Sequence, residues 1–200
     1  MTNAVIVDAV RTGGGRGKKD SGKLSNWHPV DLAAEVLKAL AERNNLDPAL
    51  IDDVVMGCVM QVGEQGVNVG RNAVLAAGWP EHVPGTTVDR QCGSSQQALH
   101  FAAQGVMAGA YDVVIAAGVE SMTRVPMGST ILNGPGKPFG PQMAQRYLPA
   151  GGLVPQGLAA ERVAERWGLD REALDAYSLE SHRRAARATD EGRFAGEIVP

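Results

Sequence analysis

The sequence predicts an α/β protein, in which short strands alternate with helices around a parallel sheet. Short apolar runs and amphipathic stretches alternate between residues 4 and 117, which is typical of βαβ units. Apolar residues make up 44% of the 200 residues and charged residues 20%, enough for a packed core. Only 4% are aromatic, so aliphatic side chains must supply most of that core.

The expected elements follow one another along the first part of the chain. We expect strands at residues 4–9, 54–60, 86–89 and 112–117, and helices at 29–44, 71–77 and 93–108. Pro29 suits the first turn of a helix, and Gly78 and Gly109 suit helix ends. The continuous Val-Val-Ile run of the last strand is typical of a sheet covered on both faces. Residues 1–120 are therefore predicted to form one α/β domain.

The composition changes in the second part of the chain. Residues 126–157 contain seven Gly and six Pro, a stretch too long for an ordinary connection. From residue 161 onward 16 of 40 residues are charged, against 25 of the first 160, and two helices fit there. One ends at Gly168 and one runs from about Arg171 to Gly192. We predict that residues 121–200 form a loop or lid domain outside the main sheet.

Charge and cysteine content exclude several classes of function. A net charge of −3 argues against a nucleic-acid surface. The apolar run at residues 4–10 is far shorter than the roughly 20 residues that span a bilayer, so no membrane segment is expected. Two cysteines without Cys-x-x-Cys spacing predict neither a disulfide framework nor a zinc site, and a reducing cytoplasm fits best. The four histidines show no metal-ligand spacing, so no metal is expected.

Residues 17–24 come within one residue of a phosphate-binding P-loop. Leu24 stands where that motif needs Ser or Thr, and Pro29 delays the helix that should follow directly. The glycines at residues 13–17 also fail the dinucleotide-binding pattern, since Lys18 replaces its third glycine. We interpret the segment as a flexible basic loop.

Cys92 lies where the strand at 86–89 gives way to the helix at 93–108. Free amides and the positive end of the helix dipole favour a thiolate there, although on composition alone a buried structural cysteine is the commoner case. Cys58 sits in the middle of an apolar strand and is expected to be an inert core thiol. His100 follows Cys92 at about 12 Å along the helix axis, too far to act as its base.

The helix after Cys92 carries a ridge of small side chains. They recur at steps of three or four residues: Ser94, Ala98, Ala102, Gly105 and Gly109. Such a ridge allows another backbone to approach closely. We therefore predict a central helix, whose ridge stays exposed when this chain stands alone.

At these residues the sequence resembles a known family. Residues 86–94 (TTVDRQCGS) and 118–122 (GVESM) resemble two signature blocks of the thiolases. Residues 8–12, 78–84 and 192–200 resemble further blocks in the same order. The resemblance implies two similar βαβαβ halves that pack their central helices together, with an inserted loop domain. It also implies a nucleophilic Cys92, acyl-CoA and CoA as substrates, no bound cofactor, and a homodimer or homotetramer.

Two positions depart from the family pattern. Ser95 stands where members usually have a glycine, and Gln156 where many place a methionine near the acyl pocket. Gln156 is therefore a candidate pocket residue, and the substrate preference stays open. The family's Gly-His-Pro and Cys-x-Gly-Gly blocks belong to a second half that these 200 residues do not include.

Three functions fit the sequence. The first is the amino-terminal part of an enzyme that cleaves 3-ketoacyl-CoA with CoA, or runs the reverse condensation, through an acyl-cysteine. The second is a non-catalytic thiolase-like module that binds lipid or acyl-CoA. The third, a decarboxylating ketoacyl synthase, fits residues 120–122 less well. In the first case the 200-residue chain alone should be inactive, because no acid or base lies within reach of Cys92.

Overall fold

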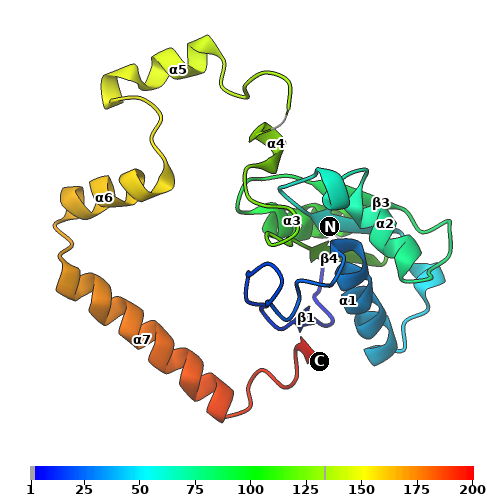
Figure 1. Ribbon diagram of the computed structural model, residues 1–200. Helices are drawn as coiled ribbons and strands as arrows, with labels where there is room; N and C mark the ends of the chain where they lie inside the picture. The colour runs from blue at the N-terminus through cyan, green and yellow to red at the C-terminus, as the bar shows by residue number, and fades with distance from the viewer. Residues whose placement is uncertain (1–2, 133) are drawn as a thin grey trace. The chain divides into compact units, whose positions relative to one another are not determined.

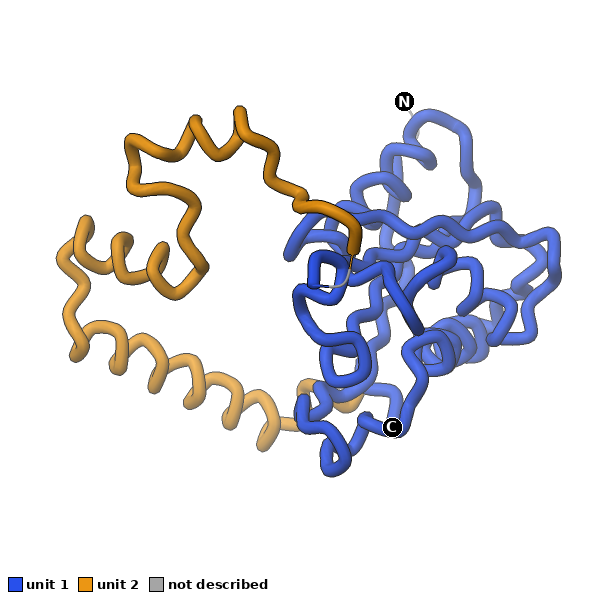
Figure 2. The backbone as a smooth tube through the Cα atoms, turned by 45° about the horizontal axis from the view of Figure 1, so that its top comes forward, with its two compact units in different colours: residues 1–133, 197–200 blue, residues 134–196 orange. Residues whose placement is uncertain are grey.

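The computed structural model describes residues 3–132 and 134–200. The chain forms two compact units (Figure 2): residues 1–133 with 197–200 make unit 1, and residues 134–196 make unit 2. Because the chain returns to unit 1 at its end, unit 2 is an insertion in unit 1. The division falls after residue 133, and the predicted domain boundary after residue 120 stays a prediction.

Three parallel strands build the sheet of unit 1 (Figure 1). β2 (Asp53–Gly57) lies between β3 (Gly85–Val88) and β4 (Val114–Gly118). The last residue of β2, Gly57, pairs with the last residues of both neighbours, so the three strands end at one level. The predicted α/β class and three of the four predicted strands are confirmed, with ends that differ by a few residues.

Helices cover both faces of this sheet. α1 (Pro29–Arg43) and α2 (Val69–Ala76) pack on one face, and α3 (Ser94–Ala108) packs against β2 and β4 on the other. Successive side chains of a strand point to opposite faces, and the neighbours Val54 and Val55 are both buried. The middle strand is therefore covered on both faces, as the apolar runs predict.

Local signals in the sequence determine where these helices begin and end. Pro29 is the first residue of α1, and the Nδ1 atom of His28 accepts the amide of Val30 at 3.3 Å. Asn68 caps α2. Gly109 ends α3 in the left-handed conformation, at φ 75°, which glycine adopts without steric cost. The predicted helix ends at Pro29 and Gly109 are confirmed, whereas α2 begins at Val69 and not at the predicted residue 71.

The small residues of α3 face its own sheet. Ala98 and Ala102 are 0% and 4% exposed, and a side chain at Gly105 would meet the ring of Tyr111 at 2.2 Å. The prediction of an exposed ridge is therefore wrong. The absence of large side chains instead lets the helix approach its sheet closely, and larger residues on other faces of α3, such as Leu99, reach solvent.

The predicted strand at residues 4–9 is wrong. Within residues 3–12 only β1 (Arg11–Thr12) pairs with another strand, in parallel with β5 (Ile198–Val199). Val5 and Val7 are 78% and 83% exposed. An apolar strand of this kind needs neighbours and cover on both faces, and within residues 3–132 and 134–200 no strand pairs with the outer edge of β4.

A cavity of about 1040 Å³ lies beside β4. The loop at residues 8–17 and the segment 120–123 form part of its wall, together with apolar side chains of α1, α3 and β4: Leu32, Val36, Leu40, Leu99, Ile115 and Ala117. The basic loop is compact, since a side chain at Gly22 would meet the Arg16 carbonyl, and it starts no helix. The expected delay of the following helix until Pro29 is thus confirmed.

Short helices complete unit 1, and longer ones form unit 2. Unit 1 contains three further short elements: η1 (Pro48–Leu50), η2 (Gly63–Gln65) and α4 (Ser129–Leu132). Unit 2 contains four: α5 (Pro141–Tyr147), η3 (Leu148–Ala150), α6 (Gln156–Trp167) and α7 (Arg171–Asp190). The two charged helices are confirmed, whereas α5 was not predicted because glycines and prolines surround it. None of these four elements has a buried residue.

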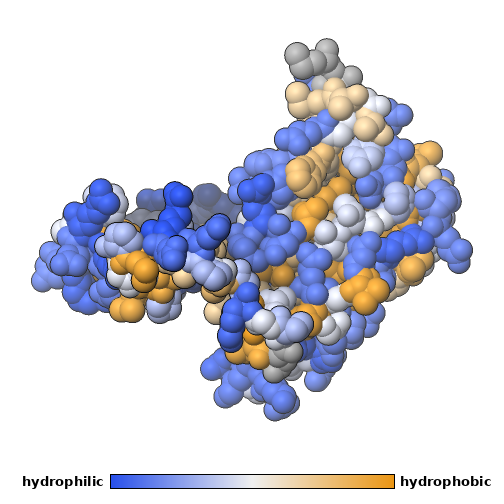
Figure 3. Space-filling view, turned by 90° about the horizontal axis from the view of Figure 1, so that it is seen from above, coloured by the Kyte–Doolittle hydropathy of each residue, from blue (hydrophilic) through white to orange (hydrophobic). Residues whose placement is uncertain are grey.

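Figure 3 shows apolar side chains, in orange, among polar ones on one face of the molecule.

Candidate active site

Cys92 lies in the turn that joins β3 to α3. The turn is closed by the Gly93 amide, which donates to the Arg90 carbonyl at 2.6 Å, and by the Arg90 amide, which donates to Ser94 Oγ at 3.1 Å. Gly93 is the N-cap of α3, so Cys92 directly precedes the helix start. The thiol is exposed. An exposed cysteine at the start of a helix has the setting of a nucleophile.

The backbone of Cys92 is strained. Its φ is +60°, a left-handed conformation that is costly for a residue with a Cβ. Backbone strain of this kind concentrates at functional sites, where the surrounding structure must enforce it. A sharp strand-to-helix turn also presents the nucleophilic serine of the α/β-hydrolases.

Two glycines make room for the start of α3. A Cβ at Gly57 would lie 2.3 Å from the Ser95 amide nitrogen, and a Cβ at Gly118 would lie 1.8 Å from Ser95 Oγ. Both distances are far below van der Waals contact. Gly57 and Gly118 are register partners on β2 and β4, so together they form a seat for the first turn of the helix. This seat fixes the residues directly after Cys92.

Cys58 is the contrasting thiol. It is 1% exposed and belongs to the apolar core, as predicted. Burial, and then the carboxylates of Glu120 and Asp89, raise the pKa of the Cys58 thiol from 9.0 to about 12. A thiol with such a pKa is almost entirely protonated at neutral pH and is a poor nucleophile.

A buried amide and a carboxylate join the segments that follow β2 and β4. Gln65 is 0% exposed. Its Nε2 donates to Glu120 Oε1 at 2.7 Å, and its Oε1 accepts the Ser121 amide at 2.7 Å. Sequence reasoning missed this pair. Glu120 lies two residues after the end of β4, but Gln65 lies eight residues after the end of β2, so no spacing rule brings the two together.

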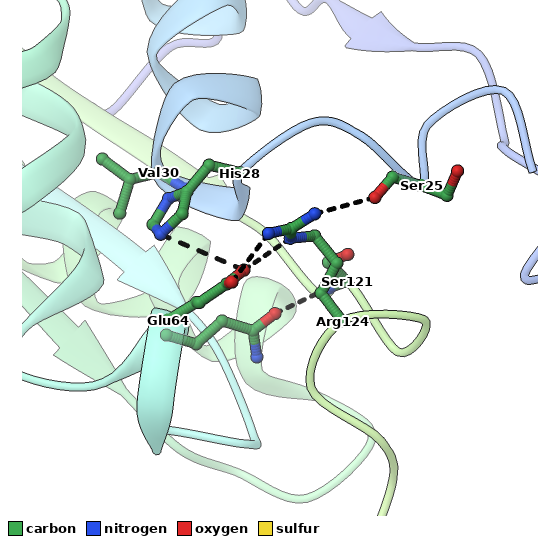
Figure 4. Close-up of polar contacts among 7 residues, drawn as sticks. Ser25, His28, Val30, Glu64, Ser121 and Arg124 are labelled. Carbon is green, nitrogen blue, oxygen red and sulfur yellow. Dashed lines mark hydrogen bonds and ion pairs between the residues drawn. The ribbon is translucent and has the colours of Figure 1, made fainter. Parts of the chain in front are cut away.

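An ion pair lies close by (Figure 4). Glu64 contacts Arg124 through two hydrogen bonds of 2.5 and 2.7 Å, and His28 lies 4.0 Å from the same carboxylate. Arg124 also donates to the Ser25 carbonyl at 2.9 Å. The hydrogen bonds from Arg124 lower the pKa of Glu64, against a smaller opposing effect of burial. The cluster thereby connects η2, the segment after β4 and the start of α1.

The other candidate residues belong to other elements of the chain. Gln156 is exposed and begins α6 in unit 2, and its role near an acyl pocket stays a prediction. His82 contacts the Ala49 carbonyl at 3.2 Å, and His100 and His182 are exposed on α3 and α7. In the described ranges no three His, Cys, Asp or Glu residues are placed to hold a metal ion. Nor does any helix there have the length and hydropathy to cross a membrane.

Known proteins resemble this chain over nearly its whole length. The family described as "Thiolase, N-terminal domain" matches residues 4–200. The steroid 3-ketoacyl-CoA thiolase FadA6 of Mycobacterium tuberculosis is 45% identical over 207 residues, which cover 100% of this chain and 49% of that protein. The 3-ketoacyl-CoA thiolase of Pseudoalteromonas translucida is 48% identical over 200 residues, with 100% and 49% covered. That of Shewanella denitrificans is 47% identical over 199 residues, with 99% and 49% covered.

The fold and the site define an α/β protein with an exposed cysteine at a strained strand-to-helix turn. Together with the match over residues 4–200, this places the chain in the thiolase family, as its N-terminal part. The predicted family membership is confirmed. The chain spans about half the length of the curated relatives that it matches.

Proposed function

We propose that the protein to which this chain belongs is a thiolase, an acyltransferase that cleaves 3-ketoacyl-CoA with CoA into acetyl-CoA and a shortened acyl-CoA, or runs the reverse condensation. The observation that carries this proposal is Cys92: it is exposed, strained at φ +60°, and directly precedes α3. The relatives named 3-ketoacyl-CoA thiolase support the same reaction.

The proposed mechanism has two half-reactions. The Cys92 thiolate attacks the 3-keto carbon and forms a carbon–sulfur bond. The bond between C2 and C3 then breaks, and its electron pair leaves with acetyl-CoA, which takes up a proton. The acyl group remains as a thioester on Cys92. The thiolate of a second CoA attacks this thioester, releases the shortened acyl-CoA and frees the cysteine.

Both half-reactions pass through oxyanions that need hydrogen-bond donors. The Cys92 amide, at the start of α3, is the donor that we assign from this chain. One such donor typically contributes roughly 3 kcal/mol of transition-state stabilisation. We propose that the remaining donors, the general base and the general acid come from the part of the protein beyond these 200 residues.

The names of the relatives bear on the alternatives and on the substrate. They are named as enzymes, which favours catalysis over the non-catalytic binding module and thiolysis over decarboxylating condensation. One name specifies a steroid 3-ketoacyl-CoA and others only a 3-ketoacyl-CoA. We therefore propose the 3-ketoacyl-CoA group that they share, with Gln156 as a candidate residue of the acyl pocket.

The partners follow from the same proposal. CoA and acyl-CoA are substrates, and no bound cofactor is needed for the two half-reactions. Two free cysteines and no disulfide among the described residues fit a reducing cytoplasm. We propose a homodimer or homotetramer, which light scattering on the full-length protein tests. A well-folded, active monomer would contradict it.

Thiolysis of acetoacetyl-CoA by the full-length protein tests the function. Loss of the magnesium–enolate absorbance should require CoA and should disappear in Cys92→Ala. The matched control is Cys58→Ala, which removes the buried thiol and should keep the reaction. Acetyl transfer to the peptide that contains Cys92, seen by mass spectrometry after acetyl-CoA is added, should accompany activity. Turnover by Cys92→Ala at the rate of the parent enzyme would overturn the assignment.

Thiol labelling tests the choice between the two cysteines without any turnover. Brief iodoacetamide treatment of the folded protein should alkylate Cys92 first, because Cys58 is buried and its pKa is raised to about 12. Prior acylation by acetoacetyl-CoA should protect Cys92. Alkylation of Cys58 before Cys92 would show that the nucleophile is misassigned.

A further inference from the structure

Gln65 has a buried side-chain amide, and both its nitrogen and its oxygen form hydrogen bonds. Its Nε2 donates to Glu120 Oε1 at 2.7 Å and to the Met60 carbonyl at 3.0 Å. Its Oε1 accepts the amide of Ser121 at 2.7 Å, and the side chain is 0% exposed. A buried polar group in such a network holds one orientation, because any other orientation leaves donors or acceptors unpaired.

The carboxylate of Glu120 accepts hydrogen bonds from the segment that follows β2. It accepts the amides of Val59 and Met60 at 2.8 and 3.3 Å, in addition to the bond from Gln65. Hydrogen bonds to an ionised carboxylate are stronger than those between neutral groups. Gln65 and Glu120 therefore clamp the segment after β2 to the segment after β4.

The clamped ends of β2 and β4 hold the backbone on both sides of the nucleophile. The Cys58 amide donates to the carbonyl of Val88, the last residue of β3, at 3.0 Å, and the Val119 amide donates to the Gly57 carbonyl at 3.0 Å. Gly57 in turn contacts the first turn of α3. The strand that enters the Cys92 turn and the helix that leaves it thus both rest on the clamped strands.

We propose that Gln65 and Glu120 are positioning residues for Cys92. They act through the ends of β2 and β4, and they keep the thiol in the strained conformation at φ +60°. This inference rests on the proposed function for its effect on turnover, but its effect on the reactivity of the thiol is independent of it.

Three variants of the full-length protein test the clamp. Glu120→Gln places an NH₂ group where a carboxylate oxygen accepts hydrogen bonds, so one donor faces another. Gln65→Glu places a second carboxylate against that of Glu120, so two acceptors face each other. Each should lower kcat by about 10- to 100-fold, the size expected for a displaced reacting group, with KM for CoA changed by less than about threefold. Each should also slow the alkylation of Cys92 by iodoacetamide. The double variant Gln65→Glu with Glu120→Gln again has an amide that donates to a carboxylate. It should therefore recover part of the lost kcat and part of the lost rate of Cys92 alkylation.

Val74→Ala is the matched control, since Val74 is 0% exposed in α2 and belongs to the apolar core. It should lower Tm without slowing the alkylation of Cys92. If the clamp variants change kcat and the alkylation rate no more than Val74→Ala does at an equal loss of Tm, the proposal is overturned. If the parent protein shows no thiolysis, the proposed function fails instead. In that case the rate of Cys92 alkylation alone tests the positioning role. Unchanged rates in both Glu120→Gln and Gln65→Glu would overturn it.

Discussion

The two units bury their helices to very different extents. In unit 1 the 15-residue helix α1 has five buried residues, and its Leu37 is 1% exposed. In unit 2 the 20-residue helix α7 has none. Both helices carry apolar residues, so the difference lies in what covers them. Unit 1 has a sheet against which its helices pack, whereas the described residues of unit 2 contain no strand.

Unit 2 is therefore held together mainly by local interactions. Asp170 caps α7, and the pairs Arg171–Asp175 and Arg184–Glu180 lie at helical spacing on its surface. Each pair stabilises a helix by only about 0.3–0.5 kcal/mol. Local interactions thus specify the helices of unit 2, whereas the helices of unit 1 also bury apolar faces against a sheet.

Core truncation gives the largest expected contrast. Leu37→Ala in unit 1 should lower the free energy of unfolding by about 2–5 kcal/mol, because it leaves a cavity in a packed core. Leu158→Ala in unit 2 should cost well under about 1 kcal/mol, because Leu158 is 54% exposed. Urea unfolding of the full-length variants measures both. A large loss for Leu158→Ala would break the comparison and show that α6 is covered in the whole protein.

The same contrast explains what the sequence could predict. Local signals sufficed for α1, α3, α6 and α7, because Pro29, Gly109, Gly168 and Asp170 each mark one of their ends. Strands β2, β3 and β4 could be predicted because each pairs with a neighbouring strand and is covered by helices. The strand at residues 4–9 failed, since strand formation depends on a partner that periodicity does not reveal.

The site was predictable only in part. Cys92 stands out because a strand-to-helix junction is a local feature, and its exposure agrees with that reading. The Gln65–Glu120 pair and the glycine seat under α3 depend on strand register and on distances between elements far apart in the sequence. No pattern in a single sequence encodes such contacts directly.

Glycine replacements should have opposite signs in the two units. Gly57→Ala should destabilise the protein by about 1–3 kcal/mol, because the new Cβ would meet the backbone of Ser94 and Ser95. It should also slow the alkylation of Cys92. Gly157→Ala in α6 meets no atom within 4 Å and should be neutral or stabilising by up to about 1 kcal/mol.

Thermal unfolding of both glycine variants measures these changes, and iodoacetamide labelling reports on the site. The seat assigned to Gly57 would be refuted by a variant that keeps the Tm and the Cys92 reactivity of the parent protein. A clear loss of Tm in Gly157→Ala would instead show that another part of the whole protein approaches α6 closely at this position.

The smallest expected effect is the pH dependence of one ion pair. Arg124 lowers the pKa of Glu64 from its usual 4.5 in the folded protein, so the pair stabilises the fold above the unfolded pKa and this contribution is lost as the pH falls through the folded pKa. The groups are partly exposed, with side-chain exposures of 29% and 35%, so solvent screening limits the contribution to below about 1 kcal/mol. Glu64→Gln should therefore be slightly less stable than the parent protein at about pH 7, and the two should converge as the pH falls through the folded pKa of Glu64. Glu180→Gln, in the more exposed pair of α7, is the control and should change stability less at every pH. Urea unfolding across this pH range measures the difference in the free energy of unfolding between Glu64→Gln and the parent protein. If this difference persists undiminished in acid, the charge of the carboxylate is not its cause.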